Sequence, residues 1–166
     1  MKKPFLLPIL SLSLALAALP AAAATPTPER YAGQQPEALL KTAPEFAKAY
    51  RSAVRDLELP TWTKRLAAGT PAEVVDIGGK PHILTSACSQ QGCQDERLYI
   101  LFDVQAKKAS GIFFLPPSRD NIDDMRVALS QWYGKPSKEA SNFLMERAMQ
   151  DAHAAAQAAA NPAAPQ

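Results

Sequence analysis

The sequence predicts an α+β fold, with an antiparallel β-sheet flanked by helices in a single domain. Three observations predict it. Apolar residues first recur at three- and four-residue steps, then alternate in short β-rich segments, and finally recur at helical steps again. Glycine, proline and polar residues separate the β-rich segments, which is typical of strands that follow one another in an antiparallel meander.

The first residues have the layout of a secretory signal peptide. Lys2 and Lys3 precede an apolar stretch over residues 5–19, and small residues follow up to Ala24, where we place the cleavage site. The apolar stretch has about 15 residues, fewer than the ~20 that cross a bilayer. We therefore expect residues 1–24 to be removed and the protein to be exported to the periplasm, without a membrane anchor.

The charge of the exported chain excludes some partners. The sequence has 18 Lys and Arg against 16 Asp and Glu, but two of the basic residues, Lys2 and Lys3, lie in the signal peptide. The remaining charges therefore balance. Nucleic acids and anionic membranes need clustered basic residues, so neither is expected as a partner.

A flexible lead-in and a helix are predicted next. Residues 25–36 (TPTPERYAGQQP) are rich in Pro and Thr without apolar periodicity, which predicts a flexible lead-in, and the domain is expected over residues 37–152. The main helix is predicted to begin at Pro44, because a prolyl ring is tolerated in the first turn only. Pro60 ends this helical region.

Strands follow over residues 73–77, 82–87, 97–104 and 110–115. The dipeptide Gly78-Gly79 predicts a tight hairpin turn between the first two of these strands. The segment RLYILFDV at residues 97–104 is apolar at both odd and even positions, which predicts a central strand that is covered on both faces.

Helices are predicted for the rest of the chain. Helical spacing relates Ile122, Met125, Leu129 and Trp132, which predicts a helix over residues 121–133. A final helix is predicted from Ser137. Residues 153–166 form an Ala- and Pro-rich tail. Because alanine has high helix propensity, the tail is expected to extend that helix and then to end in a frayed segment.

The chain has only two cysteines, Cys88 and Cys93, and the residues Ser89, Gln90, Gln91 and Gly92 lie between them. In an exported protein such a pair is most simply a disulfide. The spacing is CxxxxC, unlike the CxxC of thioredoxin-like redox sites. A zinc site needs about four ligands, and only His82 and His153 exist besides the cysteines.

No enzymatic site is predicted, and no catalytic residue, cofactor or metal ion is expected. Of the two histidines, His82 opens a strand beside a hairpin and His153 lies in the tail, so neither suggests a Ser-His-Asp arrangement. The sequence contains no nucleophile elbow and no phosphate-binding glycine loop. The disulfide instead predicts a rigid loop between two strands, and such a loop binds a partner at a reduced entropic cost.

Several motifs together resemble the Ivy family, the periplasmic inhibitors of vertebrate (C-type) lysozyme. They are LPTW at residues 59–62, GGKPHILTSAC at 78–88, the CxxxxC loop, and the segments RLYILFD and KKASGIFF that follow. The resemblance covers residues 43–115. It implies an antiparallel sheet flanked by helices, a protruding disulfide loop that enters the lysozyme cleft, and in many members a homodimer.

The loop departs from the pattern of the best-known lysozyme-blocking members, which reads Cys-Lys-Pro-His-Asp-Cys. The length is kept, but Gln91 stands at the His position and Gly92 at the Asp position. Glutamine donates an amide N–H but carries no positive charge. Two functions therefore stay open: an inhibitor that inserts residues 89–92 into a C-type lysozyme or a lytic transglycosylase, or a periplasmic binding protein with another partner.

Overall fold

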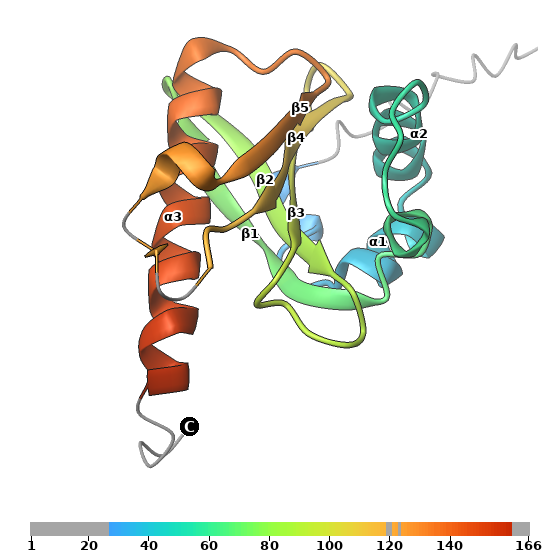
Figure 1. Cartoon of the computed structure of the whole chain (residues 1–166). Coiled ribbons are helices and arrows are strands. Elements are labelled where there is room, and N and C mark those ends of the chain that lie inside the picture. Colours follow the sequence, from blue (N-terminus) through green and yellow to red (C-terminus); the bar gives the residue numbers. More distant parts are fainter. Residues whose placement is uncertain (1–26, 119–120, 123, 161–166) are drawn as a thin grey trace, which may run out of the picture.

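The computed structural model describes residues 27–118, 121–122 and 124–160. Its centre is an antiparallel sheet of five strands in the order β1-β2-β3-β4-β5 (Figure 1). The strands are β1 (Ala68–Ile77), β2 (Lys80–Cys88), β3 (Arg97–Asp103), β4 (Lys108–Leu115) and β5 (Leu129–Tyr133). Each strand pairs with the next along the chain, so the predicted meander and the predicted α+β class are confirmed.

Helices cover both faces of this sheet (Figure 1). The short helices α1 (Pro36–Thr42) and α2 (Pro44–Ala53) lie on one face, and the long helix α3 (Lys138–Ala160) lies on the other. The described residues also include the 3-10 helices η1 (Pro28–Arg30), η2 (Thr61–Lys64) and η4 (Met125–Val127). The prediction that the main helix begins at Pro44 is confirmed, with Ala43 as its N-cap residue.

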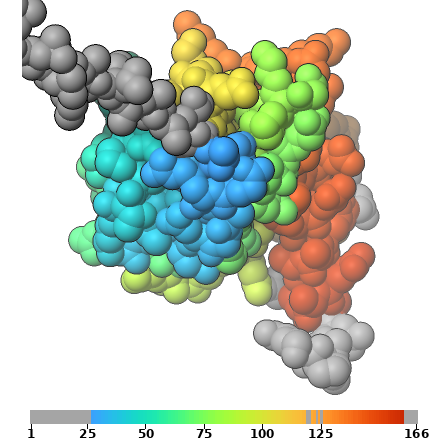
Figure 2. Space-filling model, turned by 180° about the vertical axis from the view of Figure 1, so that it is seen from behind, coloured from blue at the N-terminus to red at the C-terminus, as the bar shows by residue number. Residues whose placement is uncertain are grey.

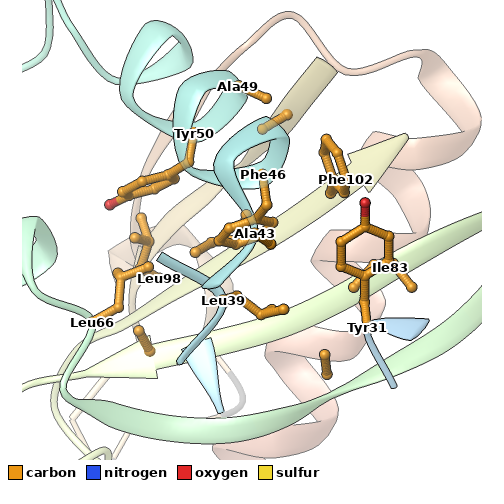
Figure 3. Packing of buried hydrophobic residues seen from close by; sticks show 14 of the residues in the cluster. Tyr31, Leu39, Ala43, Phe46, Ala49, Tyr50, Leu66, Ile83, Leu98 and Phe102 are labelled. Carbon is orange, nitrogen blue, oxygen red and sulfur yellow. The ribbon is translucent and has the colours of Figure 1, made fainter. Parts of the chain in front are cut away.

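Strand β3 separates two hydrophobic cores, as its sequence predicted. Leu98, Ile100 and Phe102 belong to the core under α1 and α2, part of which Figure 3 shows. Tyr99 and Leu101 point to the opposite face and belong to the core under α3. All five side chains are at most 2% exposed. Period-two alternation with apolar residues on both faces is what a strand between two helical layers requires.

Residues 27–35, before α1, pack against the domain, contrary to the flexible lead-in predicted for residues 25–36, of which residues 25–26 lie outside the described part. Tyr31 is fully buried, its ring meets Phe102 edge-on at 5.7 Å, and its hydroxyl donates a hydrogen bond to Glu45. Burial raises the pKa of Tyr31 to about 12. A single aromatic residue in a polar, Pro-rich segment has no periodicity, so its sequence does not reveal that it fills a core position.

The helix predicted over residues 121–133 is wrong, because this region ends in strand β5. The strand pairs with β4 and places Tyr133 opposite Gly111. The Tyr133 hydroxyl donates to the Tyr99 carbonyl oxygen at 2.6 Å, and a Cβ atom on Gly111 would lie 2.3 Å from that hydroxyl. The Tyr133 side chain therefore lies directly over Gly111 on the neighbouring strand. This tertiary packing overrides the helical spacing of the apolar residues in the sequence.

The predicted turns and the final helix are present. Gly78 and Gly79 both have positive φ, 61° and 76°, as a two-residue hairpin between β1 and β2 requires. Helix α3 begins one residue after Ser137, whose hydroxyl accepts a hydrogen bond from the Ala140 N–H. It continues through His153 to Ala160, so residues 153–160 of the predicted tail are helical, and residues 161–166 lie outside the described part of the chain.

Candidate functional site

The candidate site is the loop between β2 and β3. Cys88, the last residue of β2, is buried, Cys93 is half-buried, and the two form the predicted disulfide with their Cα atoms 5.0 Å apart. The loop extends beyond the end of the sheet (Figure 1), and its yellow-green atoms lie below the blue and teal part of the molecule in Figure 2. The disulfide therefore closes the base of a protruding segment.

The tip of this loop is a tight turn with two exposed glutamines. Ser89 and Gly92 pair as an isolated antiparallel bridge, in which the Gly92 N–H donates to the Ser89 carbonyl oxygen at 3.2 Å. Gln90 and Gln91 occupy the central positions of the turn and are both exposed. Their amides supply hydrogen-bond donors and acceptors without charge. The tip can therefore bind polar groups, including carboxylates, through neutral hydrogen bonds.

Arg97 fastens the loop to helix α3. Its guanidinium donates one hydrogen bond to the Cys93 carbonyl oxygen at 3.2 Å and another to the Asp151 carboxylate at 2.7 Å. The Tyr99 hydroxyl donates to the same Asp151 oxygen at 2.9 Å. Burial raises the pKa of Tyr99 far above its ordinary value, so the hydroxyl remains a donor at neutral pH. Because this ion pair is partly buried, it restrains the loop more than an exposed pair would.

Trp62 holds the loop from the opposite face of the sheet. Its indole N–H donates to the Glu96 carboxylate, and its ring packs against Phe113 with the centroids 6.2 Å apart. The limb between Cys93 and β3 is thus anchored in both helical layers, whereas the tip is exposed. The sequence did not identify Trp62 or Asp151 as partners of the loop, because they lie 34 and 54 residues from the positions that they contact.

The histidines lie away from this loop. His82 is near the Gly78-Gly79 turn at the other end of β2, with Nδ1 2.9 Å from the Lys80 carbonyl oxygen and Nε2 3.9 Å from Asp103. His153 belongs to α3. Within residues 27–118, 121–122 and 124–160, no three His, Cys, Asp or Glu side chains are grouped to hold a metal ion. No helix in this part of the chain has the length and apolar character of a membrane span.

The chain is similar in sequence to several known proteins. The chain is 27% identical over 117 residues to an uncharacterized protein of Pseudomonas aeruginosa, covering 68% of this chain and 76% of the relative. It is 26% identical over 98 residues to the inhibitor of vertebrate lysozyme of the same organism, covering 57% of this chain and 64% of that protein.

The inhibitor of vertebrate lysozyme of Escherichia coli is also similar, with 26% identity over 65 residues, 39% of this chain and 41% of that protein. The chain thus spans less than two thirds of the length of either named inhibitor. The sequence profile described as "Inhibitor of vertebrate lysozyme (Ivy)" matches residues 45–144, which include the whole disulfide loop and all five strands of the sheet. On that match, the chain belongs to the Ivy family.

Proposed function

We propose that this protein is an inhibitor, not an enzyme, and that it inserts residues 89–92 into the cleft of a C-type lysozyme or a related peptidoglycan-cleaving enzyme. The observation that carries the proposal is the exposed, disulfide-closed turn whose base is anchored in both helical layers. Membership of the Ivy family and the similarity to two named lysozyme inhibitors support it.

The anchoring supplies the physical basis for inhibition. A loop that is already ordered loses little conformational entropy when it binds, so more of its contact energy becomes affinity. Glycoside hydrolases of this kind place two carboxyl groups on either side of the scissile bond. The amide N–H of Gln91 at the tip can donate to such a carboxylate, and the bulk of the turn would exclude the sugar chain from the cleft.

Titration calorimetry with hen egg-white lysozyme, together with a lysis assay on bacterial cell walls, tests the proposal. We expect saturable binding and inhibition with micromolar or tighter affinity. A parallel lysis assay with lytic transglycosylases separates the two classes of target. If neither enzyme class is bound or inhibited at micromolar protein, the proposal is rejected.

A second candidate function rests on the tip itself. Neither Gln91 nor Gly92 carries a charge, so the tip lacks the charge-assisted hydrogen bonds that strengthen binding to carboxylates. In this second reading the protein keeps the family scaffold but binds another periplasmic partner. Affinity capture from periplasmic extract with wild-type protein distinguishes the two, since recovery of muramidase-type enzymes alone contradicts this reading.

The proposed site of action is the periplasm, after removal of residues 1–24. The signal peptide that the sequence predicts lies outside the described residues, and N-terminal sequencing of the exported protein tests the cleavage site. The homodimer that the family resemblance implies is a separate expectation, which sedimentation velocity of the exported chain tests directly.

A further inference from the structure

A groove of about 310 Å³ lies beside the disulfide loop, between the loop, the end of β4 and helix α3. Asp95, in the limb that leads from Cys93 to β3, forms part of its rim. Its lining is mixed: the polar side chains Gln94 and Ser118 lie in it beside the apolar residues Pro116, Pro117, Ile122, Ala152, Ala155 and Ala156. This flanking groove therefore adjoins the loop that the proposed target enzyme would receive.

Among the described residues that line this groove, Asp95 is the one that carries a charge. Residues 88–96 contain two acids, Asp95 and Glu96, and no Lys, Arg or His. Glu96 already accepts the Trp62 hydrogen bond, and the nearby positive charge of Arg97 is directed to Asp151. Asp95, in contrast, is exposed at the rim of the groove. Its carboxylate is therefore placed to meet a cation of the partner.

We infer that the flanking groove receives a lysine or arginine side chain of the inhibited enzyme, with its cationic end at Asp95. These side chains lay their methylene stems on apolar surface and keep the charged end in a polar environment. The proline and alanine side chains of the groove supply the apolar surface, and Asp95 and Gln94 supply the polar one. The inference rests on the proposed function. It adds a second contact, in which the neutral tip enters the cleft and Asp95 selects a basic side chain beside it.

The first test removes the charge at the rim. Asp95→Asn is expected to weaken inhibition of hen egg-white lysozyme by roughly fivefold at low salt, the upper range for an ion pair in partly solvated surroundings. The inhibition by wild type should weaken as NaCl rises from about 0.05 M to about 0.3 M, and the variant should lose most of that salt dependence.

Asp76→Asn is the matched control for this charge change. Asp76 lies at the β1–β2 turn, at the end of the sheet away from the loop, and accepts the Gly79 N–H at 2.9 Å. An asparagine oxygen can accept the same hydrogen bond, so the turn should be kept. This variant should inhibit like wild type at every salt concentration.

The second test changes charge on the groove wall in both directions. Ala155→Lys should weaken inhibition and Ala155→Glu should strengthen it, because α3 then adds positive or negative charge beside Asp95. The same two substitutions at Ala154, which is exposed and does not line this groove, provide the controls. Lys and Glu both have high helix propensity, so α3 should be preserved.

The outcomes separate this inference from the proposed function. If wild type inhibits but Asp95→Asn keeps its potency and salt dependence, the inference is overturned and the proposed function stands. Equal effects of the charges at positions 154 and 155 also overturn it, because they indicate a long-range field and no local contact. If wild type neither binds nor inhibits, both are overturned.

Discussion

At the residue scale, Gln91 decides how strongly the tip binds a carboxylate. We predict that Gln91→His strengthens lysozyme inhibition by about tenfold, because charge-assisted hydrogen bonds are roughly twice as strong as neutral ones. The gain should be larger near pH 5.5 than near pH 8, since histidine is protonated below about 6.5. Inhibition constants at the two pH values check this, and an equal gain at both would contradict the role of charge.

The test substitutes Gln91 alone and keeps Gly92, because a change at Gly92 would alter the backbone of the turn. Its φ of 155° lies in a region that residues with side chains rarely adopt. Replacing Gly92 by Asp would therefore change the backbone of the turn together with its charge. Gln91→Ala is the complementary variant, because it removes the amide without such strain and should weaken inhibition.

A second residue-scale prediction concerns Tyr31 and the acid stability of the domain. The hydrogen bond from Tyr31 lowers the pKa of Glu45. A lowered carboxyl pKa contributes stability that is complete above the ordinary glutamate pKa near 4.5 and is lost as pH falls through the lower native value. Tyr31→Phe should therefore cost about 1 kcal/mol of unfolding free energy at neutral pH and less in acid.

Urea unfolding of wild type and Tyr31→Phe at several pH values from neutral to strongly acidic measures this difference. The burial of the ring is kept in the phenylalanine variant, which restricts the change to the hydroxyl and its hydrogen bond. A difference in unfolding free energy that is constant across this range would contradict the link between Tyr31 and Glu45.

At the element scale, we predict that Asp151 of α3 contributes to inhibition because its ion pair with Arg97 holds the disulfide loop in place. Asp151→Asn leaves the Arg97 guanidinium without its ionic partner and should weaken inhibition about threefold or more, with faster amide exchange at residues 93–96. Glu73→Gln is the control, because the Glu73–Arg147 ion pair at 2.8 Å also joins the sheet to α3 but both of its residues lie outside the loop. Equal losses in both variants would contradict a specific role of Asp151.

The crossing of Tyr133 over Gly111 gives another prediction at this scale. Gly111→Ala should destabilise the domain by about 3 kcal/mol, because the added Cβ would lie 2.0 Å from the Tyr99 carbonyl oxygen and 2.4 Å from the Tyr133 ring. Thermal unfolding of this variant checks the value. An unchanged melting temperature would show that β5 does not pair with β4 in this way.

The sequence predicted elements well where their signals were local. The glycine pair, the prolines and the alternation of β3 identified the first four strands and the start of α2. Strand β5 was missed because Leu129 and Trp132 have helical spacing, and only the pairing with β4 shows that they belong to a strand. The Cys88–Cys93 loop was found from the chain's two nearby cysteines and its predicted export, whereas its anchors at Trp62 and Asp151 depend on tertiary packing.

At the scale of the whole molecule, the order of the strands places the disulfide loop between the two layers that cover the sheet, so that residues of both layers contact it. The β2–β3 connection leaves the centre of the sheet, so α3 reaches it from one face and the η2 turn from the other. An edge connection would have fewer such neighbours. The disulfide adds about 2 kcal/mol in the chain-entropy model, so its larger effect is expected on the shape of the loop.

The most direct test of the central claim, that this loop occupies an enzyme cleft, is titration calorimetry of the protein into hen egg-white lysozyme with and without a chito-oligosaccharide that fills the cleft. We predict saturable binding that the sugar weakens in proportion to its occupancy. Binding of equal affinity in the presence of saturating sugar, or no binding in its absence, would contradict the claim.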